Sequence, residues 1–489
     1  MTKNFLQKKS LRHILLIGIA TGLYPLLFYY SNNFSLINSW KHVAFFLALF
    51  ISFPIILMVM LHFLAPKIRF VKAHYQGLLT FSNLFLFSLF ILICLYASIP
   101  FYFLIISIVI GVVGGYFFKN HLFKIVVFQL LLAFVGLFYF VPRVHQQLTY
   151  SEDWKILTDN IERVTFTKAP NIYYIQTDGY VNFSEIGKGY YQYDNGNIKR
   201  YLENKGFNIQ YNIRSNYTAT LESNMAIFAL KHHYYNFGYN FSEMTNARET
   251  IVTDNVVLRV LKNNGYKTHF LAEWPYLISN LPKMGYDYCN FEYSSISLIS
   301  EGFGEKKEIF KSLQEVFDST ATKPNFYFME ILDPGHVTSR KSESLGKVKE
   351  KEQYFEKLER CNTKLVKIID FLTIKDPEAL IVILADHGGY VGYEYMLENR
   401  HKTDDRDLWY SAFSSQLAIK WPDGKQPEEA AYFKTSINLF RILFSYLSNN
   451  SQYLQNLQED ASFTIIEKGA PKGIYKVIDS TGAIVFKKV

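Results

Sequence analysis

The stretch Leu380–Gly392, LIVILADHGGYVG, joins a buried strand to polar residues that a protein core would not select. Its apolar run, rich in β-branched residues, predicts a strand in the centre of a sheet. The run ends in Asp386 and His387, followed by two glycines that permit close approach of the backbone. A carboxylate and a neutral imidazole are the mixed oxygen and nitrogen donors that suit zinc or manganese. The stretch therefore predicts a strand that presents two metal ligands at its carboxyl end.

Two further apolar runs end in residues of the same kind. NIYYIQTDG ends in Asp178-Gly179, and FYFMEILDPGH carries Asp333 and His336. In open α/β sheets, ligands bind beyond the carboxyl ends of the strands, so these residues are expected to face one crevice. Taken singly, Asp178-Gly179 is ordinary turn chemistry and His336 could be a surface histidine. The combination of three such ends favours a metal or catalytic site.

The chain from residue 168 to 489 alternates strand-like and helix-like segments. The patterns predict strands in NIYYIQTDG, GYKTHFLAE, PNFYFMEILDPG, ALIVILADHGG and QLAIKWPDG, and helices in SNMAIFALKHHYY, NVVLRVLKNN, EKEQYFEKLERCNTKLVKIIDFLT and SINLFRILFSYL. This alternation predicts an α/β domain whose central sheet is mostly parallel, with helices on both faces.

A possible nucleophile lies in RSNYTATLESNMAIFAL, where Thr218, Thr220 and Ser223 come just before or within the start of a predicted helix. A hydroxyl there lies beside free backbone N–H groups and the positive end of the helix dipole. The plain alternative is that these residues cap the helix. The two roles are compatible, because a capping position also faces bound anions.

The first 142 residues are strongly apolar. Five runs of about 18–23 residues are long enough to cross a hydrocarbon core, which favours five membrane-spanning helices over buried helices of a soluble protein. They cover roughly 11–30, 43–65, 78–97, 101–118 and 122–141. Residues 143–167 form a polar, amphipathic connector, expected along the membrane surface or against the domain.

Flanking cations orient these helices. Cations cluster before the first run, between the second and third, and between the fourth and fifth, which predicts a cytoplasmic N-terminus and an exported domain after residue 143. The residues are Lys3, Lys8, Lys9, Arg12, Lys67, Arg69, Lys72, Lys119 and Lys124. The net charge of +8 is thus partly a topology signal, and it argues little for nucleic-acid binding. Of the three cysteines, Cys289 and Cys361 fall in the exported part, where a disulfide is one possibility.

Taken together, these residues resemble the alkaline phosphatase superfamily, in its membrane-anchored sulfatase-like branch. That branch includes lipoteichoic acid synthases and the phosphoethanolamine and phosphoglycerol transferases of bacterial envelopes. The motifs that carry the resemblance are NIYYIQTDG, NYTATLES, FYFMEILDPGH and VILADHGG, in this order after five spans and a connector.

The resemblance implies a role for each matching residue. Asp178, Thr220, Asp386 and His387 would bind one divalent metal ion, Zn²⁺ or Mn²⁺ with Mg²⁺ as a further choice, and a second ion is left open. Thr220, three residues before Ser223, would also be the nucleophile. His336, with Asp333 and Arg214 as further candidates, would bind substrate or, in the case of His336, a second metal. His401 and Thr218 are weaker candidates for the same site.

The sequence departs from parts of this pattern. The formylglycine signature Cys-x-Pro-x-Arg is absent, because Cys289 precedes Asn-Phe-Glu-Tyr and Cys361 precedes Asn-Thr-Lys-Leu. Two cysteines also cannot build the several disulfides of the phosphoethanolamine transferases. A further histidine of the family has no certain counterpart, and His401 is the only suggestion for it.

The expected activity is metal-dependent transfer of a phosphoethanolamine or phosphoglycerol type group, through a phosphothreonine, at the bacterial inner membrane. The donor would be a membrane phospholipid and the acceptor an envelope glycan or lipid, with no nucleic acid involved. A hydrolase of the sulfatase or phosphodiesterase type and a non-catalytic glycan-binding or scaffold protein are the alternatives.

Overall fold

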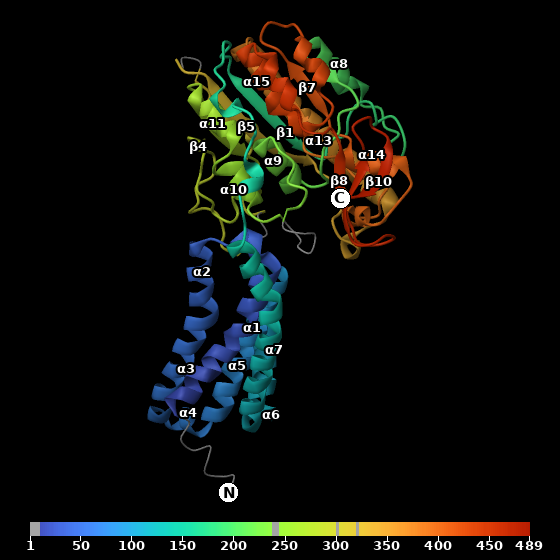
Figure 1. The fold of residues 1–489 in the computed structure, drawn as a ribbon. Coiled ribbons are helices and arrows are strands. Elements are labelled where there is room, and N and C mark those ends of the chain that lie inside the picture. The colour runs from blue at the N-terminus through green and yellow to red at the C-terminus, as the bar shows by residue number, and fades with distance from the viewer. Residues whose placement is uncertain (1–9, 237–243, 300–302, 319–321) are drawn as a thin grey trace. The chain divides into compact units, whose positions relative to one another are not determined.

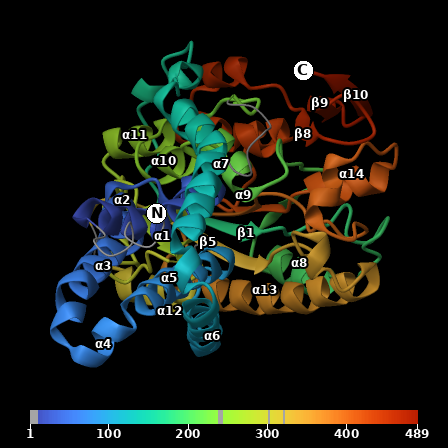
Figure 2. The ribbon, with the colours of Figure 1, turned by 90° about the horizontal axis from the view of Figure 1, so that it is seen from below.

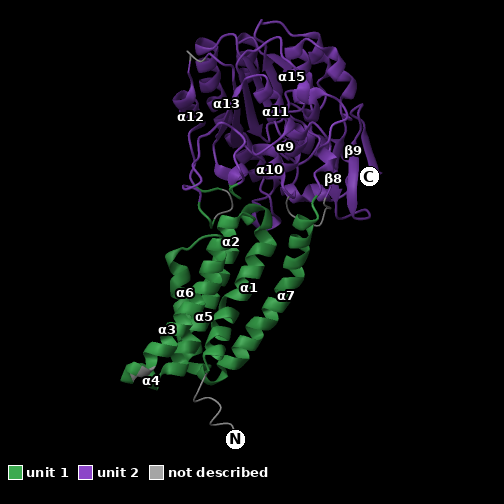
Figure 3. Cartoon of the chain, turned by 60° about the vertical axis from the view of Figure 1, so that its left-hand side comes forward, with its two compact units in different colours: residues 1–150, 279–281, 297–304 green, residues 151–278, 282–296, 305–489 purple. Residues whose placement is uncertain are grey.

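The computed structural model describes residues 10–236, 244–299, 303–318 and 322–489. Lys3, Lys8 and Lys9 of the expected cytoplasmic cations therefore lie outside the described residues. The chain divides into two compact units (Figure 3). The first holds residues 1–150 with the short segments 279–281 and 297–304, and the second holds the remainder.

The first unit is built from apolar helices, and each of the five apolar runs is helical (Figure 1). They are α1 (Leu11–Ile37), α2 (Trp40–Leu47) with α3 (Phe53–Leu64), α5 (Tyr75–Tyr96), α6 (Phe101–Phe117) and α7 (Leu122–Leu148), and the short α4 is Arg69–Ala73. Four segments have the length and composition of membrane spans: Leu11–Ile37, Trp40–Leu64, Tyr75–Tyr96 and Lys119–Leu148. The prediction of a membrane protein is confirmed. The fifth span rests on α6, which at 17 residues is shorter, and stays a prediction.

The packing of these helices depends on small and polar residues, as expected where lipid supplies no hydrophobic drive. A Cβ atom on Gly22 of α1 would lie 1.5 Å from the carbonyl oxygen of Phe50, which belongs to a π-helical turn, Ala48–Ser52, between α2 and α3. Buried Asn83 of α5 donates to Thr21 of α1 at 2.7 Å and to Gln129 of α7 at 3.0 Å. These contacts fix α1, α5 and α7 against one another.

The second unit is an α/β domain around a sheet of seven described strands in the order β2-β7-β6-β1-β5-β3-β4. The parallel strands are β6 (Leu380–Ala385), β1 (Ile172–Asp178), β5 (Asn325–Pro334), β3 (Lys267–Ala272) and β4 (Tyr288–Cys289). The edge pair β7 (Leu417–Lys420) and β2 (Asn208–Gln210) continues the sheet in antiparallel pairings, β7 with β6 and β2 with β7. The mostly parallel sheet is confirmed, and LIVIL forms part of a fully buried strand beside the central β1.

Helices cover both faces of this sheet, as predicted. Tyr173 and Ile175 of β1 pack in one core with α8 (Gly196–Asn204), α12 (Ile309–Val316) and α13 (Lys347–Lys375). Tyr174, on the opposite face, packs against α9 (Thr220–Ala229) and α15 (Leu439–Ser448) through the rings of Phe228 and Phe440. Figure 2 shows α13 along one side of β1 and β5 and α9 along the other. The short helices α10 (Ala247–Val252) and α11 (Val256–Asn263) follow α9 in the chain.

The C-terminal part differs from the sequence prediction. Residues after α15 form a second, antiparallel sheet of β8 (Ser462–Ile466), β9 (Gly473–Ile478) and β10 (Ile484–Lys488), and α14 (Arg406–Phe413) precedes β7. The helix expected in SNMAIFALKHHYY ends at Ala229, because Leu230 adopts a left-handed backbone with φ of 52°. The described cysteines are all free thiols, so the possible bridge between Cys289 and Cys361 is not formed.

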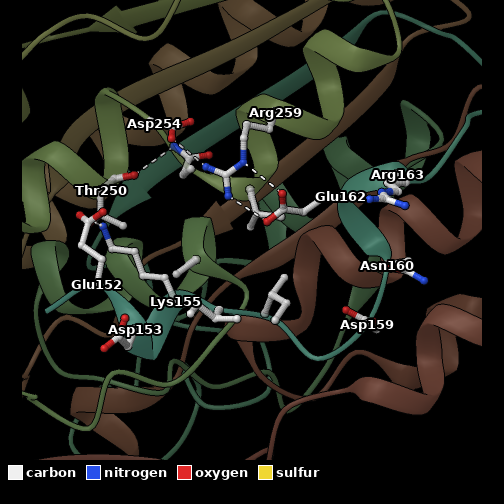
Figure 4. Close-up of a pocket in the computed structure, with 15 residues that line it drawn as sticks. Glu152, Asp153, Lys155, Asp159, Asn160, Glu162, Arg163, Thr250, Asp254 and Arg259 are labelled. Carbon is white, nitrogen blue, oxygen red and sulfur yellow. Dashed lines mark hydrogen bonds and ion pairs between the residues drawn. The ribbon is translucent and has the colours of Figure 1, made fainter.

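The connector is partly helical and belongs to both units. Its first residues continue α7 as far as Leu148, and residues from 151 onward group with the α/β domain. There it lines a cavity of about 440 Å³ together with residues near α10 and α11 (Figure 4). Arg259 bridges Glu162 at 2.9 Å and Asp254 at 2.8 Å across this cavity. Most of the charged residues that line the cavity form ion pairs with one another. We therefore interpret the cavity as the interface where the connector packs against the rest of the α/β domain.

Substituting Gly22 tests the helix packing of the first unit. Gly22→Leu should prevent α1 from meeting the π-helical turn, since backbone atoms of Phe50 occupy the space of the new Cβ. We expect a destabilisation of at least about 3 kcal/mol, seen as loss of monodisperse full-length protein and a lower Tm in detergent. The control Val109→Leu, on an exposed position of α6, should leave both unchanged. A Gly22→Leu protein with unaltered Tm would contradict this packing.

Candidate metal centre

Three side chains from two neighbouring parallel strands converge at the carboxyl edge of the sheet. Asp178 is the last residue of β1, and Asp386 and His387 directly follow β6. The Nε2 atom of His387 lies 3.3 Å from Oδ1 of Asp178 and 3.6 Å from Oδ2 of Asp386. One ligand atom from each residue lies within 4.8 Å of the others. The sequence predicted that these residues share one site, and the fold makes them neighbours.

Hydrogen bonds around this trio fix which atoms remain available. Oδ1 of Asp386 accepts from the backbone N–H groups of Gly179 at 3.1 Å and of His387 at 2.9 Å. Nδ1 of His387 donates to the carbonyl oxygen of Gly388 at 2.8 Å, which leaves Nε2 unprotonated when the ring is neutral. Such outer bonds are typical of metal ligands, because they set the orientation and tautomer of each ligand.

The atoms left over fit a metal ion. Oδ1 of Asp178, Oδ2 of Asp386 and Nε2 of His387 are all buried and have no hydrogen-bond partner in the described structure. Buried polar atoms are ordinarily paired, and these three unpaired atoms are the ones that face each other. Two carboxylate oxygens and one imidazole nitrogen form a suitable donor set for a divalent ion of the zinc or manganese type.

The electrostatics of the trio lead to the same conclusion. Burial, reinforced by the negative charge of Asp386, raises the pKa of Asp178 to about 7. Burial opposes protonation of His387, but Asp386 and Asp178 outweigh it and raise the pKa of the imidazole. Asp178 and His387 thus hold their protons more tightly than usual, and a divalent cation would relieve the same excess of negative charge.

His336 lies beside this centre. Its ring is 5.7 Å from that of His387, and Tyr390 contacts both rings at 5.9 and 5.7 Å. Nδ1 of His336 is hydrogen-bonded to the carbonyl oxygen of Val337, so this nitrogen carries the proton. Burial, and then the charge of His387, lower the pKa of His336 to about 4. Near neutral pH His336 therefore presents an unprotonated Nε2.

The packing of α9 on β1 locates Thr220, the first residue of that helix. Phe228 packs on Tyr174 with ring centroids 6.2 Å apart. Four helical residues advance about 6 Å and two strand residues about 6.6 Å, so steps from Phe228 toward Thr220 match steps from Tyr174 toward Asp178. The hydroxyl of Tyr390, beside His387, also donates to the carbonyl oxygen of Thr218. Both observations place the start of α9 toward the carboxyl edge of the sheet, where Tyr390 lies beside His387.

Thr220 also differs from Thr218 in its surroundings. Thr220 is half-buried, and its hydroxyl makes no hydrogen bond within the described chain, while Thr218 is buried. Ala219, not a threonine, is the N-cap residue, with extended backbone and no side-chain hydrogen bond. The capping alternative is therefore wrong for Thr220, because the N-cap position is occupied by Ala219.

Other candidates are engaged elsewhere. Asp333 pairs with Lys364 at 2.6 Å and Arg360 at 3.2 Å, and these cations outweigh burial and lower its pKa. The guanidinium of Arg214 donates to the carbonyl oxygens of Asp460 and Asp479, which ties down the C-terminal segment. The backbone of His401 bridges to Lys468. Substrate roles for Asp333 and Arg214 and a site role for His401 gain no support from these contacts.

Sequence reasoning missed several residues around the centre. Tyr390 was missed; it follows the two glycines and has a left-handed backbone with φ of 61°. Glu222, in the first turn of α9, is buried, and its charge contributes to the raised pKa of His387. A layer below, Gln176, Asn224 and Glu330 are buried with unpaired polar atoms. In the sequence, these three residues are recognisable only as polar residues inside apolar runs. The three-dimensional structure is needed to show that they belong to one layer.

Comparison with known proteins identifies the family of this domain. The model of the family described as Sulfatase matches residues 170–448, which is more than half of the 489 residues and includes every residue of the trio. The chain belongs to the sulfatase family. A search of curated proteins gives no match.

Several solved structures are similar at low identity. The zinc complex of the C-terminal periplasmic domain of EcEptC from Escherichia coli has 11% identity and a TM-score of 0.43, covering 64% of this chain and 93% of that one. The lipooligosaccharide phosphoethanolamine transferase A (EptA) from Neisseria meningitidis has 12% identity and a TM-score of 0.41, covering 90% and 96%. The putative sulfatase yidJ from Bacteroides fragilis has 14% identity and a TM-score of 0.41, covering 62% and 77%. These identities are too low to transfer a reaction within the sulfatase family.

Replacing one carboxylate tests the metal centre. Asp386→Asn keeps the shape of the side chain and its acceptor for two N–H groups but removes a ligand charge. We expect metal affinity to fall at least about 100-fold, measured by competition with a chelating dye, with Tm of the metal-free protein unchanged or higher because a buried unpaired charge is lost. Asp404→Asn, at an exposed position, is the control. Full metal content in Asp386→Asn would remove the centre from consideration.

Metal binding should depend on pH because protons compete for the same atoms. The pKa of Asp178 is about 7 and that of His387 is raised, so both groups bind protons in the metal-free protein at lower pH and must lose them to bind an ion. Apparent affinity for Zn²⁺ should therefore rise by roughly tenfold or more between pH 6 and pH 8. In Asp178→Asn, the affinity for Zn²⁺ should be lower over the whole pH range and should change less with pH. An affinity that is flat over this range would contradict the coupling.

Proposed function

We propose that this member of the sulfatase family transfers a phospho-alcohol group, of the phosphoethanolamine or phosphoglycerol type, from a membrane phospholipid to an envelope glycan or lipid. The observation that supports the proposal is the set of three converging unpaired ligand atoms, together with a half-buried threonine, Thr220, as the first residue of α9. The apolar helices of the first unit would keep the chain in the membrane where the donor resides. Anchoring enzyme and donor in one bilayer raises their effective concentration.

Asp178, Asp386, His387 and Thr220 would hold the metal ion, of the Zn²⁺ or Mn²⁺ type. When bound, such an ion lowers the pKa of an attached hydroxyl and stabilises negative charge on a phosphoryl group. Without it, the two carboxylates would repel an anionic phosphodiester from Thr220. The N–H groups at the start of α9 are placed to donate to phosphate oxygens.

The reaction would proceed in two displacements. Oγ1 of Thr220 attacks phosphorus, its proton passes to solvent or the departing group, and the bond to the diacylglycerol oxygen breaks. The phosphothreonine then reacts with an acceptor hydroxyl, whose oxygen bonds to phosphorus as the bond to Thr220 breaks. Nε2 of His336, unprotonated and beside the centre, would accept the proton of that hydroxyl. This role differs from phosphate binding, which would need a protonated Nε2.

The location of the domain follows from the same chemistry. Phospholipid donors and envelope acceptors meet at the outer face of the bacterial inner membrane. The cations flanking the apolar runs favour a cytoplasmic N-terminus and, with five spans, an exported catalytic domain.

The nucleophile can be tested by mass spectrometry of peptides from the full-length, metal-loaded protein after incubation with phosphatidylethanolamine or phosphatidylglycerol. A phosphate-linked adduct on Thr220 is expected, and its mass would identify the transferred group. Thr220→Ala should lose the adduct and all turnover, while Thr218→Ala should keep the adduct. If water alone discharges the adduct, the chain is a hydrolase. Absence of any adduct in a metal-loaded preparation would favour the non-catalytic alternative.

A further inference from the structure

A basic cavity of about 400 Å³ lies in the α/β domain, between the end of β3, the segment before α12, and α13. Four lysines and two glutamates line it, together with Ile309, Phe310 and Thr363. The charged residues are Lys306, Lys307, Lys364, Lys367, Glu273 and Glu308. None of these residues belongs to the metal centre, and the sequence analysis singled out none of them.

The cavity lies close to the metal centre through β5. Pro334 of β5 is the register partner of Asp178, and the N–H of Gly335 donates to the carbonyl oxygen of Asp178 at 2.9 Å. Asp333, the preceding residue, is paired with Lys364 of the cavity wall at 2.6 Å. One strand end therefore connects the reacting centre to the cavity.

Buried carboxylates form the floor of this cavity, and cations form its outer layer. The Glu273 side chain is 2% exposed and bonds Lys364 and Lys306, the latter at 3.1 Å. The Asp333 side chain, 9% exposed, is bonded by Lys364 and Arg360. In contrast, the side chains of Lys306 and Arg360 are 47% and 58% exposed. The carboxylates hold the cationic heads from beneath, and lysine and arginine retain donors beyond those used here.

The cations also form a stripe along α13. Lys357, Arg360, Lys364 and Lys367 follow one another at spacings of three, four and three residues, which places them on one side of a helix. From Lys357 to Lys367 the stripe spans about 15 Å. An ion-pair network that only anchors α13 would account for Lys364. Lys306 joins that network through Glu273, but the exposed Lys367, which lines the same cavity, has no ion-pair partner among the described residues.

We propose that the cavity and this α13 stripe bind a phosphate group carried by the acceptor, apart from the hydroxyl that reacts. The acceptor class would then be a phosphorylated envelope glycan or glycolipid rather than a neutral one. A phosphate monoester carries nearly two negative charges at neutral pH and is matched by several ammonium groups around one cavity. The cavity volume exceeds that of a phosphate group and leaves room for an attached sugar. The inference rests on the proposed function for the identity of the acceptor.

The test measures binding rather than turnover. The probe is a fluorescein-labelled oligosaccharide with one phosphate monoester, compared with the same oligosaccharide after dephosphorylation, added to the full-length metal-loaded protein in detergent. The variant Arg360→Gln/Lys367→Gln removes two exposed cations and keeps Lys364 on Glu273 and Asp333. Lys351→Gln is the matched control, because Lys351 lies on α13 about 120° around the helix from Lys357.

For the phosphorylated probe, the double variant should raise Kd about fivefold or more and Lys351→Gln less than about twofold. The dephosphorylated probe should bind more weakly to the wild-type protein and show no difference between variants. In a turnover assay the double variant should raise KM for the phosphorylated acceptor with kcat unchanged.

Equal Kd values for the two probes, or for wild type and double variant, would overturn the inference. Formation of the Thr220 adduct is read separately in the same proteins and involves neither Arg360 nor Lys367. An adduct without phosphate-dependent binding would remove this inference and leave the proposed function intact. Absence of the adduct would remove the proposed function and, with it, the acceptor role of the cavity.

Discussion

The close approach of two buried carboxylates and one imidazole, with no partner for the atoms that face each other, is the constraint on which the centre depends. Such a group is unfavourable unless a cation or protons neutralise it. The group nevertheless forms because β1 and β6 are adjacent and parallel, so the side chains at their carboxyl ends lie in the same place. Two glycines after His387 allow the turn: a Cβ on Gly388 would lie 2.2 Å from the carbonyl oxygen of Ser411, and one on Gly389 would lie 2.1 Å from the ring of Tyr354. The sheet order, the glycines and the unpaired ligands are thus parts of one arrangement.

The position of Thr220, the proposed nucleophile, depends on a second constraint, the matching repeats of helix and strand. Because α9 runs opposite to β1, one turn of the helix covers two residues of the strand, and three successive positions on each element face one another. The lowest pair is apolar, Phe228 on Tyr174, and anchors the helix. The next turn toward the start of the helix contains Asn224, which like Gln176 of β1 has buried unpaired polar atoms, and Thr220 is the first residue of the helix. The interface between α9 and β1 therefore becomes more polar from the core toward the site. Its apolar end holds the helix in place for the residues nearer the site.

The sequence predicted the fold better than the surroundings of the site. Apolar runs that end in Asp178 and Asp386, alternating with amphipathic helices, were enough to predict a mostly parallel sheet covered on both faces. The C-terminal sheet of β8 to β10 was missed because its strands are short and lie beyond the last helix. Tyr390, Glu222 and the polar layer of Asn224 and Glu330 were missed for another reason: each acquires its meaning from contacts between segments far apart in the chain. Arg214 was selected for its place near the hydroxyl motif, but its guanidinium turns to the C-terminal segment.

Membership of the sulfatase family describes the fold and does not decide the chemistry. A formylglycine-type sulfatase needs a cysteine in a specific signature, and this chain offers a threonine at the start of α9 instead. Its cysteines in the α/β domain lie elsewhere: Cys361 is on the buried face of α13, and Cys289 is in the edge strand β4. A threonine alkoxide forms a stable ester with phosphorus, which suits transfer to a second alcohol, and the apolar first unit would bring a lipid-borne ester to it. The proposed role of Thr220 and the apolar helices that precede the domain thus favour the same proposed substrate class, a phosphodiester at a membrane surface.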